Sequence, residues 1–100
     1  MFSMILNKKT LIHFLKQMRK RIQNGWCKKT FEKKINGKIH YCLLGAARQC
    51  YSRNIYESIE DYLNTKLSDK FKNVALFNDN CTRKSQVIKF LDECIKGESV

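Results

Sequence analysis

The sequence predicts an α+β fold, a mainly helical single domain of about four helices with one embedded β-hairpin. The domain spans residues 1–100, with an ordered core over about 8–96. A chain of 100 residues can bury only one modest core. Four segments repeat apolar residues at helical spacing, and an Asn-Gly pair stands between two β-compatible segments. The absence of proline, with only four glycines, argues against collagen-like and many-turned all-β architectures.

The first helix is predicted from about Lys8 to Gln23. Asn7 or Thr10 can cap its start, and Asn24-Gly25 supplies its end. One stripe of apolar side chains follows the helical period: Leu11, Phe14, Leu15, Met18 and Ile22. Basic residues lie off this stripe, so the helix should bury one face and present a basic face to its surroundings.

A β-hairpin is predicted within residues 29–42, because Asn36-Gly37 suits the positive φ angles of a type I′ turn. The turn sets three cross-strand pairs: Ile35 with Lys38, Lys33 with His40, and Phe31 with Cys42. Phe31, Ile35 and Cys42 then share one face, and Ile39 and Tyr41 the other. Since an isolated two-stranded ribbon is marginally stable, we expect the hairpin to pack on helices.

Two more helices are predicted in the middle of the chain. The first runs from Leu43 to Tyr51, with an inward set of Leu43, Leu44, Ala46, Ala47 and Cys50. The second runs from Ile55 to Leu67, with Asn54 as its cap. Its apolar side is formed by Ile55, Ile59, Tyr62, Leu63 and Leu67.

The last third of the chain is predicted to contain a short buried run, a turn and a closing helix. Periodicity does not separate helix from strand over 74–77. The cluster 78–80 indicates a turn. Thr82 then caps a helix that reaches about Lys96, where Gly97 stops it. Its apolar face is Val87, Ile88, Leu91, Cys94 and Ile95.

The net charge of +11 is concentrated in the N-terminal half. Residues 1–53 contain 13 bases and one acid, Glu32, whereas residues 54–100 contain seven bases and eight acids. Such asymmetry favours an anionic partner, namely nucleic acid, an anionic membrane surface or an acidic protein. The competing interpretation is a lysine-rich surface that only aids solubility. The apolar stripe of the first helix is needed for the core, which disfavours membrane binding.

The N-terminal segment 1–6 is apolar but too short for a signal-peptide core or a membrane span. We therefore expect a protein of the host-cell cytoplasm. Five cysteines are then free thiols, because a reducing compartment does not sustain structural disulfides. We also expect no cofactor, and a monomer or weak dimer.

Three short motifs occur in order: Gly25-Trp26-Cys27, then Tyr41-Cys42-Leu43-Leu44-Gly45-Ala46, then Phe77-Asn78-Asp79. In this order they resemble a small family of uncharacterised bacterial and phage proteins that read GWC, YCxxGA and WND. The resemblance covers roughly residues 8–96, and the chain departs from it at Phe77, where tryptophan is usual. It implies this fold and a mobile-element context, with no established chemistry.

The motifs also have a structural interpretation. The Trp26 N–H should meet a partner at the edge of the core, and Gly45 should allow close packing. The sulfurs of Cys27 and Cys42 could be neighbours. Asn78 or Asp79 should satisfy backbone N–H groups at or near the start of the closing helix.

Catalytic and metal chemistry find weaker support in the sequence. A nucleophilic Cys42 at a helix start could use His40 or His13 as a base and Asn78 or Asp79 as an orienting group. A buried and inert Cys42 is the simpler interpretation. A zinc site could draw on Cys27, His40, Cys42 and Cys50, but no paired C-x2-C or H-x3-H spacing is present. We therefore predict no catalytic activity and no metal.

The function best supported by the sequence is binding of DNA, RNA or a host nucleoprotein, without catalysis. The predicted interface consists of Lys16, Arg19, Lys20, Lys28, Lys29, Lys33, Lys34 and Lys38. Fifteen of the 20 basic residues are lysines, which favours phosphate contact over base reading. A phage-type inhibitor of a host defence system such as CRISPR would use the same face. The alternatives are a cysteine-dependent enzyme and an adaptor for an acidic protein.

Overall fold

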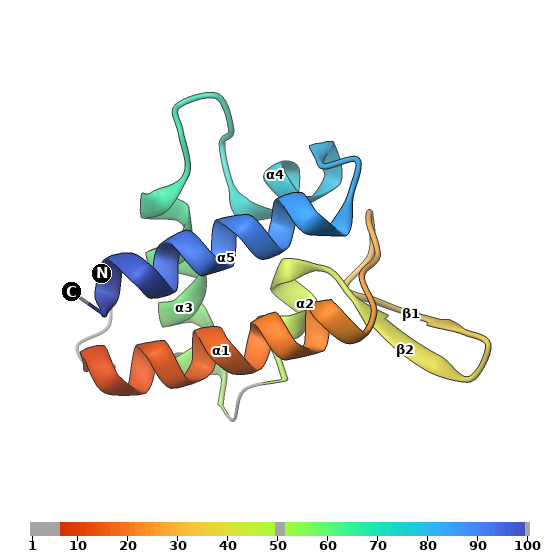
Figure 1. The fold of residues 1–100 in the computed structure, drawn as a ribbon, viewed down its shortest axis with the longest axis horizontal. Helices are drawn as coiled ribbons and strands as arrows, with labels where there is room; N and C mark the ends of the chain where they lie inside the picture. The colour runs from red at the N-terminus through yellow and green to blue at the C-terminus, as the bar shows by residue number, and fades with distance from the viewer. Residues whose placement is uncertain (1–6, 50–51, 100) are drawn as a thin grey trace.

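The computed structural model describes residues 7–49 and 52–99, which form five helices and one hairpin. Their order is α1 (Lys8–Asn24), β1 (Glu32–Ile35), β2 (Lys38–Tyr41), α2 (Leu43–Ala47), α3 (Arg53–Lys66), α4 (Val74–Asn80) and α5 (Lys84–Glu98). Figure 1 shows α1 and α5 side by side and running in opposite directions, with the hairpin extending from one end of the body. The mainly helical α+β class is confirmed.

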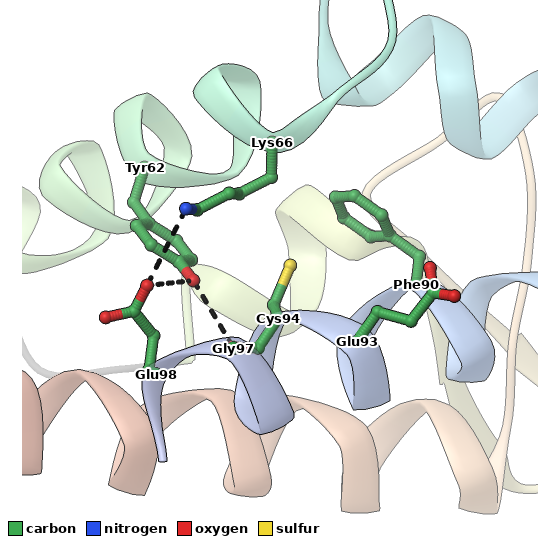
Figure 2. A pocket seen from close by; sticks show the side chains of 7 residues that line it. All are labelled: Tyr62, Lys66, Phe90, Glu93, Cys94, Gly97 and Glu98. Carbon is green, nitrogen blue, oxygen red and sulfur yellow. Dashed lines mark hydrogen bonds and ion pairs between the residues drawn. The ribbon is translucent and has the colours of Figure 1, made fainter. Parts of the chain in front are cut away.

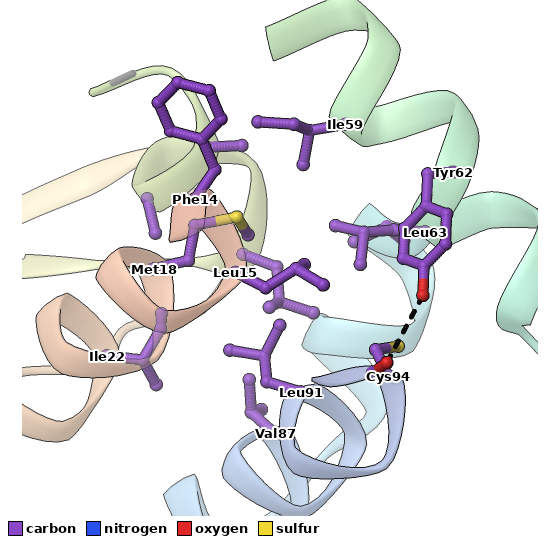
Figure 3. Close-up of a cluster of buried hydrophobic side chains, with 14 of the residues drawn as sticks. Phe14, Leu15, Met18, Ile22, Ile59, Tyr62, Leu63, Val87, Leu91 and Cys94 are labelled. Carbon is purple, nitrogen blue, oxygen red and sulfur yellow. Dashed lines mark hydrogen bonds between the residues drawn. The ribbon is translucent and has the colours of Figure 1, made fainter. Parts of the chain in front are cut away.

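The core lies where α1, α3 and α5 meet (Figure 3). All five residues of the predicted α1 stripe are buried: Leu11, Phe14, Leu15, Met18 and Ile22. From the other two helices the core receives Ile59, Tyr62, Leu63, Val87, Ile88, Leu91 and Cys94. Burying one such aliphatic side chain contributes about 1.5–3 kcal/mol. The apolar stripes therefore stabilise the helices by packing them together.

Side-chain acceptors satisfy backbone N–H groups at the helix starts, but not always where the sequence pattern placed them. Asn7 Oδ1 accepts from Thr10 N at 2.8 Å, which confirms one of the two predicted caps of α1. The predicted cap Asn54 is wrong, because α3 begins one residue before it and Ser52 Oγ accepts from Ile55 N. The predicted cap Thr82 is also wrong. At the start of α5, Gln86 Oε1 instead accepts from the backbone N–H groups of Thr82 and Arg83.

The segment predicted as a short run followed by a turn is one helix, α4. Asn73 Oδ1 caps it by accepting from Leu76 N at 3.0 Å, and Asn64 Oδ1 accepts from Val74 N at 2.9 Å. The turn prediction for Asn78, Asp79 and Asn80 was wrong. The side chains of Asn78 and Asp79 bond to distant parts of the chain and so do not compete with their own helix.

Two helix ends also differ from prediction. α5 continues through Gly97 to Glu98, because this glycine keeps a helical backbone instead of the left-handed conformation of a stop. α2 ends at Ala47. The residues predicted to continue α2 include Cys50 and Tyr51, which lie outside the described part of the chain.

The hairpin has the predicted register and turn. Ile35 pairs with Lys38 and Lys33 with His40, and Asn36 and Gly37 both have positive φ, as a type I′ turn requires. Cys42 N donates to Phe31 O at 3.1 Å, which extends the pairing to its third predicted pair.

The expected packing of the hairpin on helices is present only at its base. There the backbone of Tyr41 donates to Gly25 O and accepts from Cys27 N, which ties β2 to the segment after α1. Towards the tip, Ile35 and Ile39 are 38% and 42% exposed. The hairpin is therefore an arm anchored at its base, with exposed side chains towards its tip.

Candidate nucleic-acid interface

The three sequence motifs meet at Asn78, which is fully buried. Its Oδ1 accepts from the indole N–H of Trp26 at 2.9 Å and from the backbone N–H of Leu43 at 3.1 Å. Its Nδ2 donates to Cys27 O at 3.1 Å. The expected partner of the Trp26 indole thus exists. The expectation that Asn78 serves the closing helix is wrong, because its side chain satisfies the start of α2.

Asp79, the next residue of α4, fixes the segment that leads into the hairpin. Its Oδ1 accepts from Lys29 N at 2.8 Å. Lys29 has a φ of 67°, a left-handed conformation that disfavours residues other than glycine. The hydrogen bond to Asp79 therefore helps to hold a strained turn that directs the chain into β1.

Gly45 allows the hairpin base to contact α2. A Cβ atom at this position would lie 1.8 Å from the carbonyl oxygen of Phe31, well inside van der Waals contact. Cys42 is the N-cap of the same helix, and its Sγ accepts from Gly45 N at 3.3 Å. The YCxxGA motif therefore specifies the junction between β2 and α2, and the predicted close packing at Gly45 is confirmed.

Five of the eight predicted interface residues lie on the hairpin or the segment before it. Lys33, Lys34 and Lys38 are exposed on the two strands, Lys29 is exposed in the preceding turn, and Lys28 is half-buried. Because strand residues alternate between faces, Lys33 and Lys34 point to opposite sides of the ribbon. Within residues 7–49 and 52–99, none of these five lysines forms an ion pair.

The other three predicted residues lie on α1 and divide into two kinds. Lys16 and Lys20 are exposed on the face opposite the buried stripe. Arg19 faces α5, where its guanidinium forms an ion pair with Asp92 through Nε and Nη2. Asp92 therefore compensates the charge of Arg19, whereas Lys16 and Lys20 have no such partner among the described residues.

Sequence reasoning missed a pocket of about 380 Å³ at the base of the hairpin. Its lining includes Phe31, Cys42 and Leu44, together with Ala75 and Asp79 of α4. Phe31 is 47% exposed. The Arg48 guanidinium lies 4.1 Å from the centroid of its ring. The signal in the sequence was Phe31 itself, an aromatic residue among lysines.

The geometry around Cys42 does not favour an activated nucleophile. Burial raises the pKa of the Cys42 thiol, and the hydrogen bond from Gly45 N only partly opposes this effect. His40 Nδ1 lies 3.3 Å from Trp26 O, and no hydrogen bond within the described residues joins it to Cys42. Catalytic cysteines need a lowered pKa and a base in contact.

The four cysteines with described positions, Cys27, Cys42, Cys81 and Cys94, are all buried free thiols. The Cys27 thiol lies within hydrogen-bonding distance of the carbonyl oxygens of Thr30 and His40. In the described part of the chain, no group of three or more His, Cys, Asp or Glu side chains is placed to hold a metal ion. Cys50, the fourth ligand of the considered zinc site, lies outside that part.

A second pocket, of about 180 Å³, lies between α3 and α5 at the end of the body far from the hairpin (Figures 1 and 2). Tyr62 donates to Glu98 Oε2 at 3.0 Å, and Lys66 Nζ lies 3.7 Å from the same oxygen. Burial is the main cause that raises the pKa of both Tyr62 and Cys94, the latter to about 11. These contacts join α3 to the last turn of α5, which indicates a structural role.

The raised pKa of Cys94 predicts a loss of stability at alkaline pH. The pKa of this thiol is near 9.0 in the unfolded chain and higher in the folded protein, which therefore holds the proton more tightly. The stability that the neutral thiol contributes is fully present below pH 9. That contribution is lost as the pH rises through about 11. We expect urea denaturation to show the free energy of unfolding falling by about 2–3 kcal/mol over this interval from Cys94. Cys94→Ala should reduce the fall, and an unchanged pH dependence in this variant would contradict the assignment.

The chain matches no protein-family model, no curated protein and no solved structure. The resemblance to the GWC, YCxxGA and WND proteins accordingly stays a prediction. Within residues 7–49 and 52–99, no helix combines the length and the apolar character that crossing a bilayer requires.

Proposed function

We propose that the protein binds nucleic acid, free or within a host nucleoprotein, through its basic hairpin and the exposed basic face of α1. The supporting observation is that the arm extending from the body (Figure 1) has five lysines on it or directly before it, none neutralised by an acid among the described residues. Such a cluster generates a positive potential that attracts phosphates.

The lysines are suited to phosphate contact more than to reading bases. A lysine ammonium is a point charge on a flexible stem, whereas bidentate base recognition is typical of arginine. Lysines on both faces of the ribbon can reach phosphates on either side of it. We therefore propose binding with weak sequence preference and strong salt dependence. A mobile-element protein that blocks a host nuclease by occupying its nucleic acid is one biological form of this activity.

The double reversal Lys33→Glu and Lys34→Glu should weaken nucleic-acid binding at least tenfold at low salt. It removes two phosphate contacts and adds two repulsive charges, and each lost contact lowers the salt slope by about one. Both side chains are exposed, so the fold should be unaffected. The measurement is fluorescence anisotropy with labelled DNA and RNA between about 50 and 200 mM salt.

The matched control is Lys70→Glu with Lys72→Glu. These lysines are exposed in the connection between α3 and α4, away from the hairpin in Figure 1, and the net charge changes by the same amount. An equal loss in both double variants would show that only total charge matters. Absence of binding by the unmodified protein at low salt would favour the acidic-protein adaptor instead.

A further inference from the structure

The pocket at the hairpin base has both apolar and charged lining residues. Phe31, Leu44 and Ala75 contribute apolar surface, and Asp79 and Lys29 contribute a carboxylate and an ammonium group. Its volume of about 380 Å³ is in the range of small-ligand sites. It opens directly beside the segment that leads into the basic arm.

The ring of Phe31 is accessible as a surface on which a planar ligand can stack. Phe31 is 47% exposed, although its backbone is fixed by the hydrogen bond from Cys42 N. The Arg48 guanidinium lies over the ring and is itself 3.6 Å from Glu60 Oε2. This cation–π contact holds one aromatic ring in place at the pocket mouth, so a planar ligand would meet a surface that is already ordered.

The charges around the pocket favour a base over a phosphate as its occupant. Asp79 Oδ1 accepts from Lys29 N at 2.8 Å and from Asn78 Nδ2 at 3.5 Å, and the carboxylate repels a phosphate from the pocket. The same carboxylate can accept hydrogen bonds from the N–H groups on the edge of a nucleobase. Lys29 at the pocket edge, together with Lys28 and Lys33 outside the pocket, is placed for the phosphates.

We propose that this pocket holds one unpaired nucleobase of a single-stranded nucleic acid, stacked on Phe31, while the flanking phosphates lie on the neighbouring lysines. The inference rests on the proposed function and narrows it from nucleic acid in general to single strands. Stacking of a base on an aromatic side chain is tolerant of sequence and typical of single-strand binding.

The first test compares three fluorescent probes of equal length at low salt: a mixed-sequence DNA single strand, the same strand with abasic residues, and a duplex. The intact strand should bind roughly tenfold more tightly than the abasic strand, which has the same phosphate charge. It should also compete better than the duplex. Equal affinity for the intact and abasic strands would overturn the base pocket but leave the proposed function standing. Failure to bind any probe would overturn both.

Variants of Phe31 test whether its ring causes the preference for the intact strand over the abasic strand. Phe31→Ala should lower the affinity for the intact strand to that for the abasic strand, without changing the salt slope. Phe31→Leu keeps an apolar side chain but no ring, and it should behave like Phe31→Ala; it also serves if the alanine variant unfolds. Phe31→Trp should retain binding. If both ringless variants still distinguish the two strands tenfold, the proposal is wrong.

Asp79→Asn tests which part of the nucleic acid enters the pocket. The substitution retains an oxygen that can accept from Lys29 N but removes the negative charge. With a base in the pocket, the intact strand should bind more weakly, because a neutral amide is a weaker acceptor than a carboxylate. Stronger binding of both strands would show that a phosphate enters instead, and would overturn the proposal.

Discussion

Gly45→Ala should destabilise the protein by about 3 kcal/mol or more. The added Cβ would lie 1.8 Å from the Phe31 carbonyl oxygen and 2.7 Å from its carbonyl carbon. Both are backbone atoms, so no side-chain rotation relieves the clash, and the hairpin base must move away from α2. That movement breaks the hydrogen bond from Cys42 N to Phe31 O. Overpacking of this kind usually costs about 1–3 kcal/mol, and a lost buried hydrogen bond adds to it.

The same substitution at Gly97 is the matched control, and we expect it to change the free energy of unfolding in the opposite direction. Gly97 also lies in a helix, and nothing stands within 4 Å of a Cβ built there. Alanine is the better helix former, so Gly97→Ala should stabilise the protein by up to about 1 kcal/mol. Chemical denaturation of both variants measures the difference. An unchanged free energy of unfolding in Gly45→Ala would show that α2 and the hairpin base are not in close contact.

The helices could be predicted from the sequence because each is specified by residues close together in the chain. The stripe of α1 recurs every three or four residues, and all of its members are buried. The Asn36-Gly37 turn likewise fixes the hairpin register locally. Residues 78–80 misled the prediction because asparagine and aspartate favour turns when their side chains bond to nearby backbone. Here the Asn78 side chain bonds to Trp26, Cys27 and Leu43, which lie 35 to 52 residues away, and it makes a longer contact of 3.5 Å with the neighbouring Asp79 side chain.

The candidate site was predictable in charge but not in shape. Counting bases located the lysines of the hairpin, since composition does not depend on the fold. It could not show that Arg19 is compensated by Asp92, 73 residues away. Nor could it show the pocket, whose walls come from the hairpin base, α2 and α4. Such features depend on how distant segments pack.

Asn78→Ala should have the second large effect, a loss of about 3–5 kcal/mol in the free energy of unfolding. The change leaves three groups without their partner: the Trp26 indole N–H, Leu43 N and Cys27 O. Each buried polar group left unsatisfied costs about 1–3 kcal/mol, and the vacated side-chain volume adds a cavity. A domain of this size typically has only about 5–15 kcal/mol in total, so the variant should lose a large part of its stability.

Asn80→Ala is the matched control for this prediction, because it removes the same side chain two residues further along α4. Asn80 is exposed and donates to Leu76 O within its own helix, so its loss should cost less than about 1 kcal/mol. A double-mutant cycle with Trp26→Phe isolates the indole bond. If that bond contributes as described, Trp26→Phe should cost much less in the Asn78→Ala background than alone, with a coupling of about 1 kcal/mol or more. Strict additivity would mean that Asn78 contributes through packing, and that the GWC and FND motifs are not joined by this hydrogen bond.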